Sequence, residues 1–467
     1  APEDITENDL HIEAIFTFPG QERGSDSYSI PIFFKNFVVD DVGLPLYLRI
    51  RLEASWKKSS SPDGSIESKI YYIIASEEED IRDEDKKPAS RHDLSHIKTI
   101  YVPAIRNPVE QLKNVSGTIL SRVLNGINWS DGTKESLKDK IREVDAVFDQ
   151  ETGVYMLKKA VKNQWKNYHS DYRYTDATMK FNSTDLDTML KKVEVKFSPT
   201  ETTRDYDVEE LGDGLRSLFY LSLVNSLLDI ENSIMKESVE KKEGDRLSFN
   251  ITPPVLTIVA VEEPENHISP QLLGKITSNL KNISEKDNAQ TVLTSHTPAI
   301  IKRIEPKSIR HFRMCKNQMC TKVKKITLPE AKGNAEIEAT YKYVKEAVQA
   351  YPEIYFSRLT VLGEGDSEEI ILPKIIELLG NNIDSCGISI VPLGGRHVNH
   401  FWRLLNDLEI PFITLLDLDR ERFGGGWSRI KYVKNLLIEI GEDKKVLLAL
   451  KDGEVLSEDD LEDMHNW

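Results

Sequence analysis

The stretch that decides the fold opens with Arg358-Leu-Thr-Val-Leu-Gly-Glu364-Gly-Asp-Ser-Glu368-Glu369 and closes with Phe412-Ile-Thr-Leu-Leu-Asp417-Leu-Asp419-Arg420. Each end is a short apolar strand that runs directly into carboxylates. Between them lie two helical patterns, at residues 368–379 and 397–408, and a further apolar strand at residues 387–391. This β-α-β-α-β order predicts an α/β fold with a parallel sheet and right-handed crossovers. Because strand C-termini share one edge of such a sheet, we expect Glu364 and the Asp417/Asp419 pair to converge there.

Carboxylates gathered at one edge repel one another, and burying them unpaired is costly. A divalent cation removes that cost, and ligation by oxygen alone suits Mg²⁺ or Mn²⁺ rather than zinc. Such an ion can orient a water and stabilise the charge of a phosphodiester under attack. The alternative is a solvated acidic loop after each strand, but the acids that follow the first strand favour a metal site.

The length and composition of the chain indicate several domains and no membrane-spanning segment. Its 467 residues predict two or more domains, and no apolar run approaches the ~20 residues needed to cross a bilayer. Three cysteines argue against a disulfide framework, and the first residues show no secretory signal, so we expect a cytoplasmic protein. The net charge of -16 excludes a generic attraction to nucleic acid, so DNA binding must come from local basic patches or from metal.

A second set of motifs lies upstream. Residues 210–219 place Gly212, Gly214, Arg216 and Ser217 at the start of an apolar helix, where backbone N–H groups and the helix dipole favour phosphate. Residues 255–261 are a continuously apolar strand of the buried parallel type. That strand ends in the tandem acids Glu262-Glu263, and a neighbouring strand ends in Ser295-His296.

Tandem acids after a buried strand suit ATP hydrolysis. The first acid, Glu262, can hold Mg²⁺ through water, and the second, Glu263, can orient or deprotonate the attacking water. His296 lies at the end of the neighbouring predicted strand, from which it can contact a γ-phosphate. A sheet that merely has polar strand ends is the alternative.

The chain in order predicts five segments. Residues 11–18, 46–54 and 69–75 alternate like antiparallel strands, whereas residues 110–192 are mostly helical and polar. We expect the first lobe of an ATPase at 1–108, a helical insertion for dimerisation at 109–192, the second ATPase lobe at 193–330, a linker helix at 331–355 and a metal-dependent domain at 356–467.

Both sets of motifs resemble known families. Glu364, Gly365, Glu368 and Asp417-Leu-Asp419 resemble a Toprim domain, the metal-dependent fold of topoisomerases, primases and certain nucleases. The upstream residues resemble an ABC-type ATPase. On that resemblance, residues 212–217 match the signature, Glu262 and Glu263 match the Walker B acids, and His296 matches the switch histidine. A Gly-X-X-X-X-Gly-Lys-Ser/Thr phosphate loop occurs nowhere in the sequence, and we expect it to precede Ala1; the alternative is a domain that does not bind ATP in the usual way.

This order of domains resembles the OLD (overcoming lysogenization defect) family of nucleases. The resemblance spans nearly the whole chain and implies ATP-regulated, metal-dependent DNA cleavage by a homodimer or larger homo-oligomer, commonly in bacterial antiphage defence. It also implies a defence-system partner protein or nucleoprotein, such as a helicase or a retron reverse transcriptase with its DNA. Glu364, Glu368, Asp417 and Asp419 match the family's metal ligands. A further acid and a basic residue of that site are unassigned, with Glu454, Glu458 and Asp459 as the available acids.

A glycine-rich basic loop follows the second pair of acids, with the sequence Arg420-Glu-Arg422-Phe-Gly424-Gly-Gly426-Trp427-Ser428-Arg429. Its arginines and Arg396 are expected to hold DNA phosphates, with a plain surface loop as the alternative. Two other function classes remain open. One is an ATP-dependent DNA-clamping or scaffold subunit that does not cut, and the other is nucleotidyl transfer as in a primase.

Overall fold

The computed structural model describes the chain in seventeen segments and divides it by packing into two compact units. The units are Ala1–Glu262 with Leu280–Leu293, and Glu263–Asn279 with Thr294–Trp467. Among the described residues, no helix has both the length and the apolarity that a membrane crossing requires. The described residues are 6–18, 30–41, 45–59, 61, 63–104, 122–168, 190, 193, 195–198, 204–240, 247–266, 268–315, 320–326, 349–393, 398–420, 422–451 and 453–463.

The N-terminal strands form an antiparallel sheet in the order β1-β3-β4-β5, with β2 also paired to β3. This confirms the three strands expected from alternating residues, which extend further than the pattern indicated. Phe34, Leu48 and Tyr72 form its buried core, where the rings of Phe37 and Tyr72 stack at 4.4 Å. Burial raises the pKa of Tyr72 to about 12. The elements are β1 (Glu7–Thr17), η1 (Ile32–Phe34), β2 (Val38–Val39), β3 (Tyr47–Lys57), β4 (Ser65–Ile73), η2 (Asp83–Asp85), β5 (Lys86–Pro88) and α1 (Arg91–Leu94).

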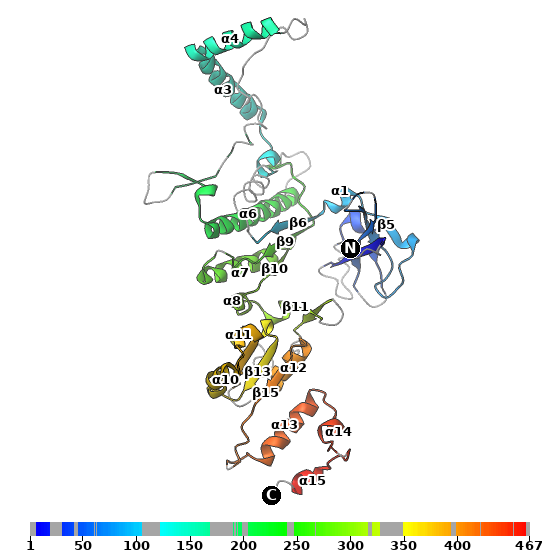
Figure 1. Cartoon of the computed structure of the whole chain (residues 1–467). Coiled ribbons are helices and arrows are strands. Elements are labelled where there is room, and N and C mark those ends of the chain that lie inside the picture. Colours follow the sequence, from blue (N-terminus) through cyan, green and yellow to red (C-terminus); the bar gives the residue numbers. More distant parts are fainter. Residues whose placement is uncertain are drawn as a thin grey trace. The chain divides into compact units, whose positions relative to one another are not determined.

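A second sheet has the strand order β10-β9-β6 and contains the predicted apolar strand. β6 (Ile97–Val102) and β9 (Leu256–Glu262) pair in parallel, as expected, and β10 (Ala289–Thr294) lies on the other side of β9. In β9, every second residue is fully buried and its neighbours are half-buried, so burial on both faces is less complete than the continuous apolar run indicated. The long helix α6 (Asp213–Glu240) runs alongside β6 and β9 (Figure 1).

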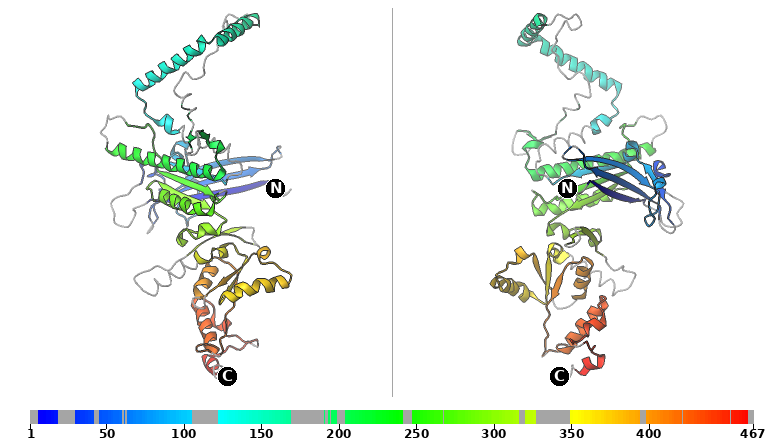
Figure 2. Two further views of the ribbon diagram at one scale, coloured as in Figure 1. Left: turned by 90° about the vertical axis from the view of Figure 1, so that its left-hand side faces the viewer. Right: turned by 45° about the vertical axis from the view of Figure 1, so that its right-hand side comes forward.

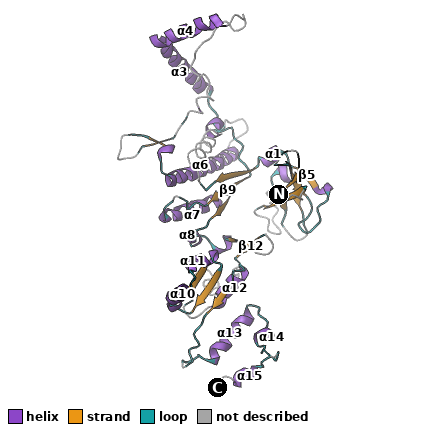
Figure 3. Ribbon diagram, in the orientation of Figure 1, coloured by secondary structure: helices purple, strands orange, loops and turns teal. Residues whose placement is uncertain are grey.

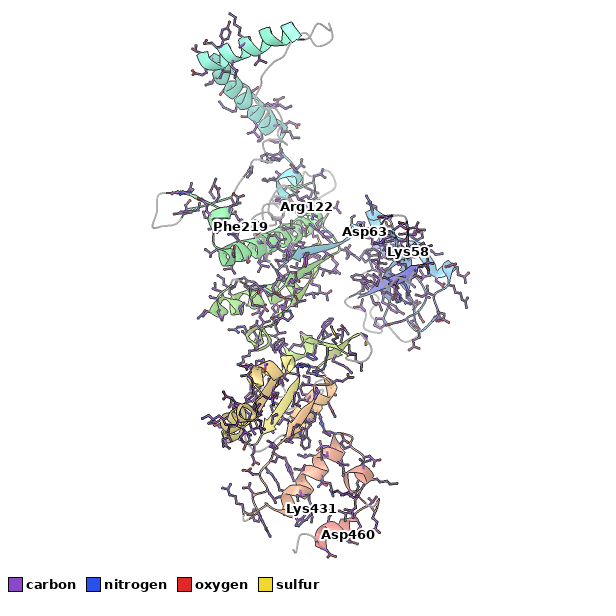
Figure 4. The ribbon with its side chains drawn as sticks, in the orientation of Figure 1. Lys58, Asp63, Arg122, Phe219, Lys431 and Asp460 are labelled. Carbon is purple, nitrogen blue, oxygen red and sulfur yellow. The ribbon has the colours of Figure 1, made fainter. Side chains whose placement is uncertain are left out.

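In the predicted helical region, the described residues 122–126 are helical, and they are followed by α3 (Asp131–Gln150) and α4 (Thr152–Tyr168), which follow each other closely (Figure 2). Arg122, labelled in Figure 4, lies just before them and pairs with Glu231 of α6 at 3.2 Å. The Glu231 side chain is fully buried, so this ion pair anchors the start of the helical region to the α6 helix. Beyond the helices, β7 (Lys196–Phe197) pairs with β8 (Tyr206–Asp207).

The C-terminal sheet is parallel, in the order β14-β13-β15, as the β-α-β-α-β pattern predicted. Helices α10 and α12 lie on opposite sides of it (Figures 1 and 2). The fully buried residues Leu362 and Leu405 belong to its core, and Trp402 donates a hydrogen bond to Thr414 at 2.7 Å. The elements are β13 (Leu359–Gly363), α10 (Asp366–Leu378), α11 (Ile383–Cys386), β14 (Ile388–Pro392), α12 (Val398–Asp407) and β15 (Phe412–Thr414).

The remaining elements lie between or beyond these sheets in sequence, and Figure 3 distinguishes the helices from the strands. The antiparallel strands β11 and β12 form a hairpin. Its Lys322 and Lys324 both pair with Glu409, at 3.1 and 2.8 Å, and so attach the hairpin to the loop after α12. Most of the predicted linker helix lies outside the described residues, and its described end contains a 3-10 helix. These elements are η4 (Val208–Glu210), α7 (Pro270–Ser284), α8 (Pro298–Ile301), η5 (Pro306–Ser308), β11 (Arg310–Met314), β12 (Thr321–Lys325), η6 (Pro352–Phe356), α13 (Trp427–Glu439), α14 (Lys444–Leu447) and α15 (Glu458–Asp463).

Candidate active sites at the strand edges

Glu364 and Asp417 meet at the carboxyl edge of the C-terminal sheet. Glu364 directly follows the last residue of β13, and Asp417 lies three residues beyond β15. The Glu364 carboxylate accepts a hydrogen bond from the Asp417 backbone N–H, with 2.6 Å between Oε2 and N. Because β13 and β15 pair directly and in parallel, their C-terminal ends lie side by side. The sheet topology therefore brings together two acids that are far apart in sequence.

Glu368 lies in the first turn of α10 and faces back toward the start of that helix. Its Oε2 accepts a hydrogen bond from the Gly365 N–H at 2.8 Å, as in a capping box. A Cβ atom at Gly363 would lie 2.6 Å from the Cβ of Glu368, so only glycine fits at the end of β13. Glu368 therefore satisfies a free N–H group at the helix start, and its negative charge suits the helix dipole there.

Asp419 is held in a tight turn with positive backbone φ. Its φ of 47° is a conformation that costs a residue other than glycine about 1–3 kcal/mol. The Gly426 N–H donates to the Leu418 carbonyl at 2.7 Å, and a Cβ at Gly425 would overlap the Asp419 carbonyl group. The glycines of the basic loop therefore allow the chain to fold back against the second acid of the Asp-Leu-Asp sequence.

Two arginines of the predicted DNA-binding loop contact carboxylates: Arg429 is largely buried, whereas Arg422 remains mostly exposed to solvent. The Arg429 guanidinium donates to Glu364 Oε1, with 2.8 Å between Nη2 and the oxygen, and both side chains are about four-fifths buried. Arg422 pairs with Asp419 at 3.3 Å. Arg420 is exposed, and Arg396 lies outside the described residues. The Glu364–Arg429 pair had no signal in the sequence, because 65 residues separate its members.

The donor set fits a hard divalent cation in its chemistry, because all four predicted ligands are carboxylates. Within the described segments, however, no group of three or more histidine, cysteine, aspartate or glutamate side chains is arranged to hold a metal ion. Of the four predicted ligands, Glu364 and Asp419 each form an ion pair with an arginine, and Glu368 caps the N-terminus of a helix.

The tandem acids lie at the end of β9, and Glu262 is held by the end of the neighbouring strand β6. Its Oε2 accepts hydrogen bonds from the Tyr101 hydroxyl and, at 3.2 Å, from the Ala104 N–H. The hydrogen bond to Glu262 raises the pKa of Tyr101. Sequence reasoning did not single out Tyr101, although its position at the end of β6 could have indicated it once the parallel pairing with β9 was known.

Glu263 and His296, which the ATPase motifs placed after neighbouring strands, face each other. His296 Nε2 lies 3.0 Å from Glu263 Oε1, and the Asn266 amide donates to the other carboxylate oxygen at 2.9 Å. Glu263 has a φ of 43°, the left-handed conformation that often occurs at functional sites. Sequence reasoning missed Glu265, whose Oε1 accepts hydrogen bonds from Ser295 at 2.8 Å and from the His296 N–H at 2.9 Å. Glu265 thus fixes the turn that carries His296.

The predicted signature lies at the start of α6. The helix begins at Asp213, so Gly214 lies inside its first turn and not in a preceding Gly-X-Gly turn. A Cβ at Gly212 would meet no atom within 4 Å, so the backbone before the helix is open. Arg216 turns back, pairs with Asp213 at 3.0 Å and donates to the Leu211 carbonyl at 2.7 Å. Its guanidinium is therefore engaged locally, while Ser217 is half-buried one turn into the helix.

The fold and these sites define an ATPase domain followed by a TOPRIM domain. The family model described as AAA ATPase domain matches residues 51–301, which are slightly more than half of the chain. The chain therefore belongs to that family. Residues 355–419 match the family described as overcoming lysogenization defect protein-like, TOPRIM domain. Both expected domains are confirmed, and together they imply a metal ion and nucleotide binding in general.

Relatives of known name are similar at modest identity. An OLD nuclease of Thermus scotoductus is 19% identical over 340 residues, which are 70% of this chain and 57% of that protein. An endonuclease GajA of Bacillus cereus strain HuB5-5 is 22% identical over 281 residues, 56% of this chain and 39% of that protein. A second GajA, of strain VD045, is 23% identical over 209 residues, 44% of this chain and 31% of that protein. The chain therefore spans little more than half the length of the first relative and less of the others.

Proposed function

We propose that this chain is a divalent-metal-dependent DNA endonuclease of the OLD type, regulated by ATP. The observation that carries the proposal is the 2.6 Å hydrogen bond between Glu364 and the Asp417 N–H, which unites acids from two strand ends at one edge. The names of the similar proteins, OLD nuclease and endonuclease GajA, support a nuclease over other reactions of TOPRIM domains. DNA is accordingly the proposed substrate.

In this proposal, Glu364 and Asp417 hold Mg²⁺ or Mn²⁺, with Asp419 and Glu368 as further oxygen ligands. The ion supplies a positioned, acidified water and stabilises charge on the phosphodiester. The chain's own residues orient the reaction: the hydrogen bond to the Asp417 backbone fixes one Glu364 oxygen, and the tight turn fixes Asp419. Arg420, which is exposed beside this edge, contacts the DNA backbone.

In the ATPase domain, Glu262 holds the nucleotide's Mg²⁺ and Glu263 acts as the base for the attacking water. His296, 3.0 Å from Glu263, senses the γ-phosphate, and the segment from Gly212 to Ser217 contacts nucleotide held by a second copy of the chain. ATP thereby regulates cutting through contacts within a homodimer or larger homo-oligomer. We expect the protein to act in the bacterial cytoplasm against phage DNA, together with a defence-system partner.

Supercoiled plasmid is the substrate that tests this proposal. We expect nicked and linear products with Mg²⁺ or Mn²⁺ and none after chelation. Glu364→Gln and Asp417→Asn should each reduce cutting at least 100-fold while thermal unfolding stays cooperative. The matched control is Glu369→Gln, the same chemical change at an exposed position of α10. Undiminished cutting by Glu364→Gln would reject the site.

A DNA scaffold that does not cut is the second candidate. It is favoured by the pairing of Glu364 and Asp419 with arginines, and by the lack of a three-ligand group among the described residues. The same plasmid experiment decides between the two. ATP-dependent binding of plasmid without any cutting, under every metal condition, would support the scaffold.

A further inference from the structure

Arg429 occupies a place that is unusual for a DNA-binding arginine. It lies in the first turn of α13, where the helix dipole disfavours a positive charge. Its guanidinium points to Glu364 and stands 6.0 Å from the ring centre of Tyr432. The Nε atom is buried and has no hydrogen-bond partner in the described part of the chain. The carboxylate of Glu364 therefore provides the compensation that the local position does not.

The arrangement around Glu364 leaves each carboxylate oxygen with one partner. Oε2 receives the Asp417 N–H at 2.6 Å, and Oε1 receives Arg429 at 2.8 Å. Arg422, from the same glycine-rich turn, also pairs with Asp419 at 3.3 Å, but its side chain is 81% exposed. A cation placed on Glu364 would stand within a few ångströms of the Arg429 guanidinium. Like charges at that range repel, and the repulsion doubles for a dication.

From these contacts we infer that Arg429 is a positioning residue that exchanges partners. While no divalent cation is bound, Arg429 neutralises Glu364. When a divalent cation takes the place of the guanidinium beside Glu364, Arg429 leaves Glu364 and binds a DNA phosphate. The inference rests on the proposed function, because it assumes that Glu364 is a metal ligand. It goes further by making one side chain couple metal binding to DNA binding. A guanidinium that leaves a carboxylate finds in phosphate the partner that best matches its planar shape.

The exchange predicts opposite effects on the two ligands. Arg429→Gln removes both the competing cation and its repulsion, so Mn²⁺ should bind at least about tenfold more tightly than to the wild type. In the wild type, Ca²⁺ should increase the affinity for a short DNA duplex, because it frees Arg429. That increase in DNA affinity should be lost in Arg429→Gln, because the glutamine side chain has no charge with which to bind a phosphate.

The measurements are Mn²⁺ titration followed by electron paramagnetic resonance, and duplex binding by fluorescence anisotropy with and without Ca²⁺. Arg403→Gln is the matched control, since Arg403 pairs with Glu439 at 2.6 Å on the exposed side of α12. It should change neither affinity. Arg429→Lys keeps the charge and should retain the weaker Mn²⁺ affinity of the wild type. If Arg429→Gln fails to fold, Arg429→Lys decides the question. Binding of Mn²⁺ by Arg429→Lys at least about tenfold more tightly than by the wild type would contradict the exchange.

Failure of this inference differs from failure of the proposed function. If wild type binds Mn²⁺ and cuts DNA, but Arg429→Gln binds Mn²⁺ equally or more weakly, then only the exchange is wrong and Arg429 is structural. If wild type and Glu364→Gln bind Mn²⁺ with the same affinity, then Glu364 is not a ligand and both ideas fall together.

Discussion

Replacing Gly425 by alanine tests the turn that carries the second acid of the C-terminal site. The added Cβ would overlap the Asp419 carbonyl, lying 2.5 Å from its carbon atom and 3.1 Å from the Arg422 carbonyl oxygen. Carbon atoms in contact stand about 3.5–4.0 Å apart. The turn must therefore open by about 1 Å, and its neighbours are backbone atoms that cannot rotate away.

The cost follows from the bonds that close the turn. The Gly425 N–H donates to Arg422 at 3.0 Å, and the Gly426 N–H donates to Leu418 at 2.7 Å. Overpacking of this kind costs about 1–3 kcal/mol, and each strained hydrogen bond adds about 0.5–1.5 kcal/mol. We therefore expect Gly425→Ala to lower the free energy of unfolding by about 2–6 kcal/mol. Because Asp419 moves with the turn, plasmid cutting should fall at least tenfold.

Urea unfolding followed by tryptophan fluorescence measures the first effect, and the plasmid assay measures the second. Gly132→Ala is the control, because its Cβ would meet nothing within 4 Å and Gly132 lies in the first turn of α3, outside the proposed site. Equal stability and equal cutting by the two variants would refute the close approach between Gly425 and Asp419, and with it the geometry assigned to the turn.

Three further predictions concern other parts of the chain. Burial raises the pKa of Glu231 from its ordinary value of 4.5, although Arg122 opposes the shift, so the folded state binds this proton more tightly than the unfolded state. Stability should therefore fall as pH rises above about 4.5 toward the folded pKa, and Glu231→Gln should flatten that slope in urea midpoints measured from pH 4 to 8. The Cys315 N–H donates to the Cys320 carbonyl at 2.8 Å, and opposite residues of such a pair have Cα atoms about 5.5 Å apart, within disulfide range. Diamide should oxidise this pair with loss of two hydrogens by mass spectrometry, whereas a bond from either cysteine to Cys386 instead would show the hairpin register to be wrong. Trp402 is 3% exposed and donates to a threonine hydroxyl of β15 at 2.7 Å, so Trp402→Phe should lower the free energy of unfolding by about 1–3 kcal/mol, and an unchanged urea midpoint would contradict that contact.

Local patterns were sufficient for the elements of the fold. The apolar strand before Glu364, the helix after it and the strand before Asp417 each follow from residue periodicity, which depends only on neighbours in sequence. The right-handed crossover rule then fixed the parallel sheet and the shared edge. The same rules placed Glu263 and His296 after neighbouring strands, whereas the contact between the two side chains came only from the structure.

The partners of the site residues could not be read from periodicity, because each depends on a contact between distant segments. Nothing near Arg429 in sequence indicates Glu364 as its partner, and the loop composition instead favoured DNA phosphate for all its arginines. Glu368 matches a metal ligand of the family by resemblance, and the sequence did not indicate that its carboxylate also caps the N-terminus of α10.

The sequence by itself determined which residues form strands and helices, which acids end at one sheet edge, and which families the chain resembles. Only the tertiary structure decided that Arg429 neutralises Glu364, that Tyr101 holds Glu262, and that Glu265 fixes the turn at His296. The physical reason is the range of the interactions. Secondary structure is set by hydrogen bonds and side-chain patterns a few residues apart, whereas a charge in a folded protein takes its partner from whichever segment the packing brings within about 4 Å.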